Sequence, residues 1–168
     1  MRILALDLGT RTGWAWYCEG SLRGLLVPGG IESGTQDFAL GRGESPGMRF
    51  IRFRKWFDAM LTDARPDLVV YEQPHHRGGA ATEILVGMST RVQELCALDR
   101  ITVTNCHTGT LKKHATGSGR ASKQDMIAAA ERWWGKVTTD DNEGDALCLL
   151  AWALEEFGEG AAHVPPGG

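Results

Sequence analysis

The chain has 168 residues, of which 42% are hydrophobic and 23% charged, so its length and composition are those of one globular domain and exclude a disordered, collagen-like or disulfide-stapled chain. Its apolar runs are far shorter than the ~20 residues of a membrane helix and its four cysteines lie far apart, which predicts no membrane partner and free thiols in a reducing, cytoplasmic compartment. Because the net charge is −3, a nucleic-acid partner has to be bound by a local basic patch.

Apolar runs separated by turn-forming residues predict the elements in chain order. Strands are expected over 2–6, 13–20 and within 22–34, before a glycine-rich loop over 39–47. The later elements are a helix over 48–64, a buried strand within 67–74, a helix over 80–98, a strand over 101–105, and helices over 107–116, 122–134 and 142–157. Residues 1–157 then form one α/β domain, a mixed central sheet flanked by helices, and residues 158–168 a flexible tail.

Three acidic residues stand at the ends of these apolar elements. Asp7 ends the first strand, Glu72 ends the strand of 67–74, and Asp145 lies near the start of the last helix. Sites in α/β folds are built at strand ends, and a carboxylate on a buried strand is costly unless it is paired or holds a metal. Each acid alone has a structural interpretation, as a turn cap or an arginine partner. The three together favour a metal site.

The last helix offers two candidates for a fourth ligand. Asp141 lies four residues before Asp145 and Asn142 three before it, so both share its helical face, while Asp140 or Asp141 is expected to be the N-cap. Oxygen ligands without a His or Cys cluster favour Mg²⁺ or Mn²⁺. Two such ions, about 4 Å apart, promote phosphodiester cleavage. The acids therefore predict a metal-dependent nuclease with two ions in its site and no small-molecule cofactor.

Residues 107–123, HTGTLKKHATGSGRASK, concentrate positive charge. The segment has no acid, and its basic residues expected to bind DNA are Lys112, Lys113, Arg120 and Lys123. Its T-G-S-G run and the helix beginning at Ser122 would bring backbone N–H groups to phosphate oxygens. A solvated surface loop with ordinary lysines is the alternative interpretation.

A second basic group follows Glu72 almost directly. His75, His76 and Arg77 are expected to project from the same sheet edge as the acids. Adjacent histidines on a loop lack the spacing of a zinc site. We therefore expect these three residues to contact DNA at a distorted point.

Four segments resemble the bacterial and phage RuvC family of Holliday-junction resolvases: LALDLGTRTGWA, VVYEQP, LKKHATGSGRASKQDM and DDNEGDALCLLAWA, in order over roughly residues 1–157. The resemblance implies an RNase H-like fold. It also implies a homodimer that makes paired symmetrical nicks in a four-way DNA junction with Mg²⁺ or Mn²⁺, in the bacterial host cytoplasm if the protein is phage-encoded. By the same resemblance, Asp7, Glu72 and Asp145 bind the metals. Lys112 and Lys123 then lie near the scissile phosphate.

The chain departs from the family pattern in two places. Family members usually have an acid where this chain has Asn142, so Asp141 is expected to serve as the fourth ligand. His75 stands in the region where the family commonly has an aromatic wedge. The helix of 80–98 matches the family's dimerisation helix. Its apolar residues serve either a dimer or the monomer core: Ile84, Leu85, Met88, Val92 and Leu95.

Two other functions remain open from the sequence. A ribonuclease H acting on RNA–DNA hybrids would use the same metal chemistry. A junction-binding protein that has lost catalysis is supported by Asn142, which offers an oxygen without a charge. The LDLGTRTG turn also resembles the first phosphate loop of sugar kinases, but those folds need a second domain that 168 residues do not supply.

Overall fold

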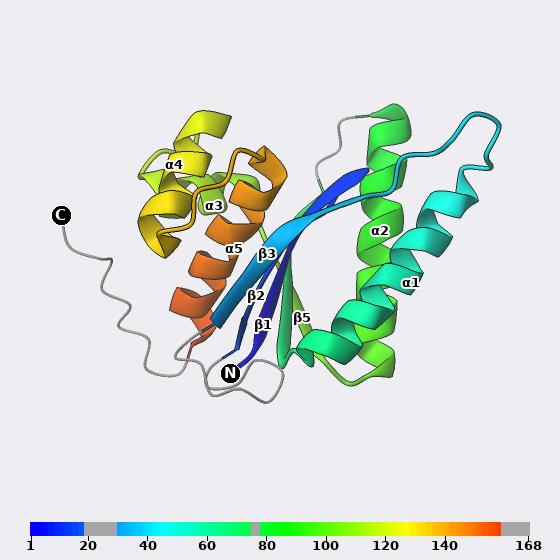
Figure 1. Cartoon of the computed structure of the whole chain (residues 1–168), viewed down its shortest axis with the longest axis horizontal. Coiled ribbons are helices and arrows are strands. Elements are labelled where there is room, and N and C mark those ends of the chain that lie inside the picture. Colours follow the sequence, from blue (N-terminus) through cyan, green and yellow to red (C-terminus); the bar gives the residue numbers. More distant parts are fainter. Residues whose placement is uncertain (19–29, 75–77, 159–168) are drawn as a thin grey trace.

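A computed structural model of the chain describes residues 1–18, 30–74 and 78–158. These residues form a five-stranded sheet with helices on both faces (Figure 1). The strands are β1 (Ile3–Asp7), β2 (Arg11–Cys18), β3 (Gly30–Asp37), β4 (Leu68–Glu72) and β5 (Thr102–Cys106). The helices are α1 (Gly47–Ala64), α2 (Gly79–Leu98), α3 (Thr108–Thr116), α4 (Lys123–Trp134) and α5 (Asp141–Phe157).

The sheet is mixed, as predicted, with the strand order β3-β2-β1-β4-β5. β1 pairs antiparallel with β2, and β2 with β3, whereas β1–β4 and β4–β5 are parallel. The register matches Leu6 with Tyr71, one residue before each strand ends. Because parallel neighbours end at the same edge of a sheet, Asp7 and Glu72 come out side by side.

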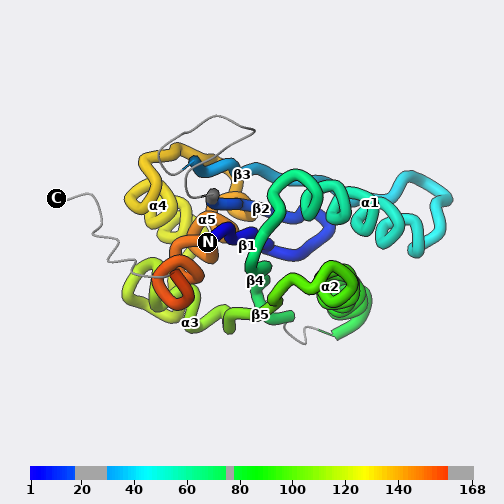
Figure 2. Tube along the Cα trace, turned by 90° about the horizontal axis from the view of Figure 1, so that it is seen from below, coloured from blue at the N-terminus to red at the C-terminus, as the bar shows by residue number. Residues whose placement is uncertain are grey.

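Two hydrophobic cores lie on opposite faces of the sheet. α1 and α2 cover one face, and α3, α4 and α5 cover the other (Figure 2). In β1, Ile3 and Ala5 belong to the core under α3–α5, while Leu4 and Leu6 belong to the core under α1 and α2. A strand buried on both faces has a continuous apolar sequence, which is why residues 3–6 form an unbroken run. Each fully buried leucine contributes about 2 kcal/mol.

The predicted helices are confirmed, with boundaries within one or two residues of those expected. Ser122 caps α4 in a capping box with Asp125, as its spacing predicted. Two strands differ. β3 runs later than the expected 22–34, and residues 19–29 lie outside the described part of the chain. β2 begins at Arg11, two residues before the expected start, so Gly13 lies inside the strand and not at its beginning.

The apolar residues of α2 serve the monomer's own core. Met88, Val92 and Leu95 are buried in the cluster under α1 and α2. Ile84 and Leu85 are partly buried against the same cluster. These five residues are therefore explained by intramolecular packing, and the homodimer stays a prediction.

The structure bears on two further predictions, the free cysteines and the lack of a membrane-spanning helix. Cys96, Cys106 and Cys148 are buried free thiols, as predicted, and burial raises the pKa of each to about 12. Thiols that hold their protons so tightly are not nucleophiles at neutral pH. No helix in the described ranges has both the length and the apolar character to cross a membrane.

Candidate active site

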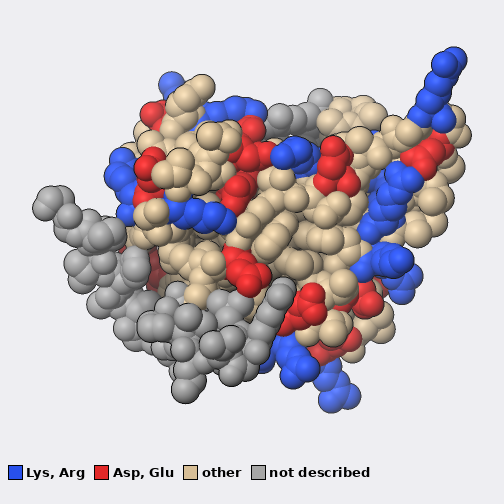
Figure 3. Space-filling view, in the orientation of Figure 1, with Lys and Arg blue, Asp and Glu red and all other residues tan. Residues whose placement is uncertain are grey.

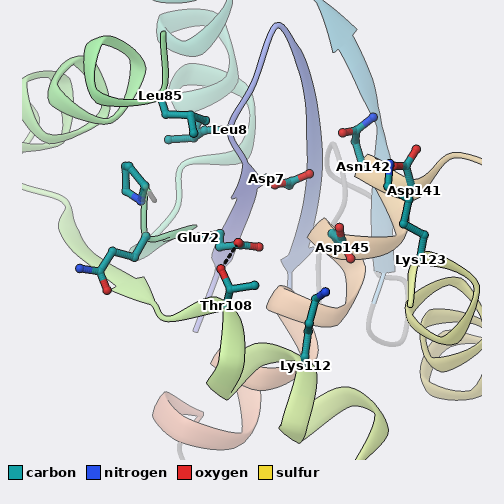
Figure 4. Close-up of a pocket in the computed structure, with 12 residues that line it drawn as sticks. Asp7, Leu8, Glu72, Leu85, Thr108, Lys112, Lys123, Asp141, Asn142 and Asp145 are labelled. Atoms are coloured by element: carbon teal, nitrogen blue, oxygen red, sulfur yellow. Dashed lines mark hydrogen bonds and ion pairs between the residues drawn. The ribbon is translucent and has the colours of Figure 1, made fainter. Parts of the chain in front are cut away.

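A pocket of about 280 Å³ lies at the carboxyl edge of β1 and β4 (Figure 4). It brings together all four predicted metal ligands and two of the predicted lysines: Asp7, Glu72, Asp141, Asp145, Lys112 and Lys123. Over the face in Figure 3, acidic and basic side chains are interspersed rather than gathered by sign. The positive charge next to the four pocket acids comes from the two lysines that line the same pocket, Lys112 and Lys123.

Helix α5 brings its acids to the strand ends because the carboxylate of its N-cap bonds both to the helix itself and to strand β2. Asp140 is the N-cap, and its Oδ1 accepts the N–H of Asn142 at 3.0 Å. Nε of Arg11, at the start of β2, donates to Oδ2 of the same carboxylate at 2.8 Å. The predicted choice between Asp140 and Asp141 as the cap is thereby decided, which leaves Asp141 to face the pocket.

The first turn of α5 also lies directly over β2. Gly13 pairs with Asp7 in the β1–β2 register. A Cβ at this position would lie 1.9 Å from the carbonyl oxygen of Asn142. The absence of a side chain at residue 13 therefore lets α5 approach the strand that carries Asp7.

The pocket carries more negative charge than its surroundings neutralise. Burial raises the pKa of Asp7 well above its ordinary value, and the charges of Asp145, Glu72 and Asp141 raise it further. Burial also raises the pKa of Asp145 to about 7, with Glu72 and Asp141 adding to the shift and Lys112 opposing it. Oδ1 of Asp145 is buried without a hydrogen-bond partner among the described residues. Mutually repelling, desolvated carboxylates are typical of a cation site.

The donor set fits a hard divalent cation such as Mg²⁺ or Mn²⁺, because it consists of carboxylate oxygens and one amide. The unpartnered Oδ1 of Asp145 supplies a ligand atom that the described protein leaves unsatisfied. In the described ranges, however, no three acidic, histidine or cysteine side chains converge tightly enough to hold one ion as they stand. Glu72 is bonded to Thr108 and Asp141 to Lys123.

The two candidates for the fourth ligand both line the pocket. Asp141 forms an ion pair with Nζ of Lys123, whereas Nδ2 of Asn142 donates to Oδ1 of Asp140 at 3.1 Å. Glu143, the next residue of the helix, does not line the pocket and accepts a hydrogen bond from Ser33 Oγ at 2.7 Å. Asp141 as the fourth ligand stays our prediction.

The predicted DNA-binding residues separate into three groups. Lys112 and Lys123 reach the pocket, and Nζ of Lys112 donates to the carbonyl of Ala121 at 2.9 Å. Lys113 lines a different hollow, beside α5, and Arg120 is exposed in the loop before α4. The predictions for His75, His76 and Arg77 concern residues outside the described part of the chain.

Two amides of the T-G-S-G run, which we expected to bind phosphate, donate hydrogen bonds within the chain. Gly117 has a φ of 82° and ends α3 by donating its N–H to the carbonyl of Lys113 at 2.8 Å. The amides of Ser118 and Arg120 donate to Thr116 Oγ1 and Ser118 Oγ, at 3.2 and 3.3 Å. Phosphate binding by the run stays a prediction, and in this structure these amides serve to end one helix and lead into the next.

Thr108 is a pocket residue that sequence reasoning missed. It begins α3, and its hydroxyl donates a hydrogen bond to Oε1 of Glu72. Leu8 and Leu85, also missed, line the side of the pocket away from the lysines (Figure 4). Nothing in the local pattern of these residues indicates a site, since their place depends on how the strands and α2 assemble.

The burial of Asp145, together with the charges of its neighbours, predicts that Asp145→Asn stabilises the protein when divalent ions are chelated. Ionising a carboxyl whose folded-state pKa is about 7, against an ordinary 3.8, disfavours the folded state. The penalty is absent near pH 4, where the carboxyl is protonated when folded, and is complete above pH 7. Urea unfolding at pH 8 should show the variant to be more stable by on the order of 1 to 4 kcal/mol. Equal stability at pH 8 would contradict the raised pKa of Asp145 on which the prediction rests.

No protein-family model matches the chain, and no curated protein matches it. Solved structures do. Thermus thermophilus RuvC shares 19% identity over 93% of this chain and 96% of its own, with a TM-score of 0.68. The same protein in complex with a Holliday junction substrate matches at 19% identity over 89% of this chain and 90% of its own, with a TM-score of 0.69.

A structure with lower sequence identity also matches the fold of this chain. The yeast mitochondrial Holliday junction resolvase Ydc2 shares 12% identity over 89% of this chain and 78% of its own, with a TM-score of 0.55. At such identities the likeness establishes the fold. It confirms the predicted α/β architecture of the RNase H-like kind, with a mixed sheet flanked by helices.

Proposed function

We propose that the protein is a metal-dependent endonuclease that resolves four-way DNA junctions by paired symmetrical nicks. The observation that carries the proposal is the pocket itself, where four carboxylates meet at the carboxyl edge of β1 and β4 with two lysines beside them. The fold adds support, because it is shared with RuvC, which has been solved with a Holliday junction substrate. No small-molecule cofactor is part of the proposal.

Asp7, Glu72, Asp141 and Asp145 are the residues that would hold two Mg²⁺ or Mn²⁺ ions. Such ions, when bound, supply an activated water and stabilise charge on the leaving oxygen. Asp7 would serve both ions, because the charges of Glu72 and Asp145 both act on its carboxylate. The backbone geometry of β1, β4 and α5 keeps these acids at one edge and so orients them before DNA arrives.

Lys112 and Lys123 would bind the scissile phosphate. Lys112 is held in place by the carbonyl of Ala121, so its ammonium group faces the acids without having to be ordered by substrate. Lys123 is paired with Asp141, and a phosphate or a metal ion would compete for one member of that pair. Fixed positive charge beside a phosphate stabilises the additional charge of the transition state.

Paired symmetrical nicks require two active sites related by a twofold axis. A homodimer with cyclic symmetry provides them, and we propose that two copies of the chain act on one junction. The remaining predicted DNA contacts of Lys113 and Arg120 would then lie along the junction arms, while His75, His76 and Arg77 stay predicted contacts at a distorted point. Binding to phosphates predicts a steep loss of affinity with rising salt.

A cleavage assay on a synthetic four-way junction tests the proposal. We expect paired nicks with Mg²⁺ or Mn²⁺ and none with a chelator, whereas a linear duplex should stay intact. Equal cutting of a replication fork would broaden the substrate to branched DNA, and cutting of an RNA–DNA hybrid alone would move the protein to the ribonuclease class. Tight junction binding without cleavage in any metal would contradict the nuclease and favour a binding protein.

A further inference from the structure

We propose that Thr108 is a positioning residue that fixes the Glu72 carboxylate for metal binding, an inference that rests on the proposed function. The Thr108 hydroxyl donates a hydrogen bond to Oε1 of Glu72, and both residues line the pocket. In Figure 4 the other carboxylate oxygen of Glu72 is directed to the side on which Asp7 and Asp145 lie. The bond therefore selects which oxygen is presented to the other acids.

Strand register places Thr108 beside Glu72. β5 runs parallel to β4 with Cys106 opposite Glu72, and the N–H of Gln73 donates to the carbonyl of Cys106 at 2.8 Å. α3 begins two residues after Cys106, at Thr108. The hydroxyl therefore sits on the edge where β4 ends, held there by the sheet and not by a flexible loop.

Capping of α3 does not account for this hydroxyl. The side-chain cap is His107, whose Nδ1 accepts the N–H of Gly109 at 3.1 Å. A threonine at a helix start commonly accepts from its own helix, whereas Thr108 donates to a carboxylate from another strand. Hydrogen bonds to an ionised acceptor are roughly twice as strong as neutral ones.

Glu72 needs such a partner because the neighbouring acids repel it. Asp7, Asp141 and Asp145 line the same pocket, and an unrestrained glutamate would turn away from them. A donor on the far oxygen holds the carboxylate in one side-chain conformation. Outer partners of metal ligands typically account for 10- to 100-fold in metal affinity or activity.

Three variants separate this role from a structural one. Thr108→Val keeps the shape and removes the hydroxyl, Thr108→Ser keeps the hydroxyl, and Thr110→Val makes the same change at an exposed residue of the same helix. The first readout is the rise in melting temperature as Mn²⁺ is added, and the second is the Mn²⁺ concentration that gives half-maximal junction cleavage. Both should shift to about 10- to 100-fold more Mn²⁺ in Thr108→Val, and stay near wild type in the other two.

Two further measurements, made in chelator, bear on the inference. Thr108→Val should keep the wild-type melting temperature and junction affinity. If the Thr108→Val protein does not fold, Thr108→Ala takes its place. An unchanged Mn²⁺ response in a folded variant would overturn the inference, as would failure of both variants to fold. A wild-type protein that neither responds to Mn²⁺ nor cuts would overturn the proposed function as well, so the two failures are distinguishable.

Discussion

Asp7→Asn is expected to abolish junction cleavage, with a loss of at least about 1,000-fold, the equivalent of about 4 kcal/mol of transition-state stabilisation. The charges of Glu72, Asp141 and Asp145 all act on Asp7, and we propose that its carboxylate would serve both ions. Asparagine has nearly the same shape and keeps one oxygen but no charge. The β1 backbone should therefore be undisturbed while the site loses its common ligand.

The rate of the first nick at saturating Mg²⁺ measures this effect. Binding of Asp7→Asn to the same junction in chelator should equal wild type or exceed it slightly, since a negative charge near the phosphates has been removed. Asp58→Asn, at an exposed position of α1, makes the same chemical change away from the pocket and should cut normally. Cleavage by Asp7→Asn at the wild-type rate would end the two-metal proposal.

The acids could be predicted because strand ends and helix spacing are local properties of the sequence. Asp7 and Glu72 each close an apolar run, and two parallel strands bring such residues to one edge. Asp141 and Asp145 are four residues apart, which places them on one helical face wherever the helix lies. The capping box at Ser122 was predictable for the same reason, since its partner is three residues away.

The supporting contacts could not be predicted, because they join residues that only the assembled sheet brings together. Thr108 reaches Glu72 through the β4–β5 register, and Arg11 reaches Asp140 across 129 positions of sequence. The part of the T-G-S-G run in helix termination could not be predicted from its glycine spacing either, because the positive φ of Gly117 at the end of α3 is seen only in the structure.

Gly13→Ala is expected to damage both stability and cleavage, because the methyl group would occupy the space of α5. A Cβ at residue 13 would lie 1.9 Å from the carbonyl oxygen of Asn142 and 2.3 Å from its carbonyl carbon. Contacts below 3.0 Å are essentially never seen, so backbone on one side must move by about 1 Å. That backbone belongs to the first turn of α5, beside Asp141 on the helix and Asp7 on β1.

Such a displacement reaches the chemistry without changing any functional group. A misplacement of about 1 Å can cost around 100-fold in rate, and a forced contact in a packed region costs about 1 to 3 kcal/mol. Urea unfolding in chelator measures the loss of stability. Junction cleavage at saturating Mg²⁺ measures the loss of rate. Gly47→Ala is the matched control, since its Cβ would meet only Ser45 Oγ at 3.8 Å and alanine favours the helix. If the Gly13→Ala protein is as stable and as active as Gly47→Ala, then α5 can move away from β2 without displacing its acids. The close approach of α5 to β2 would in that case not matter for the site.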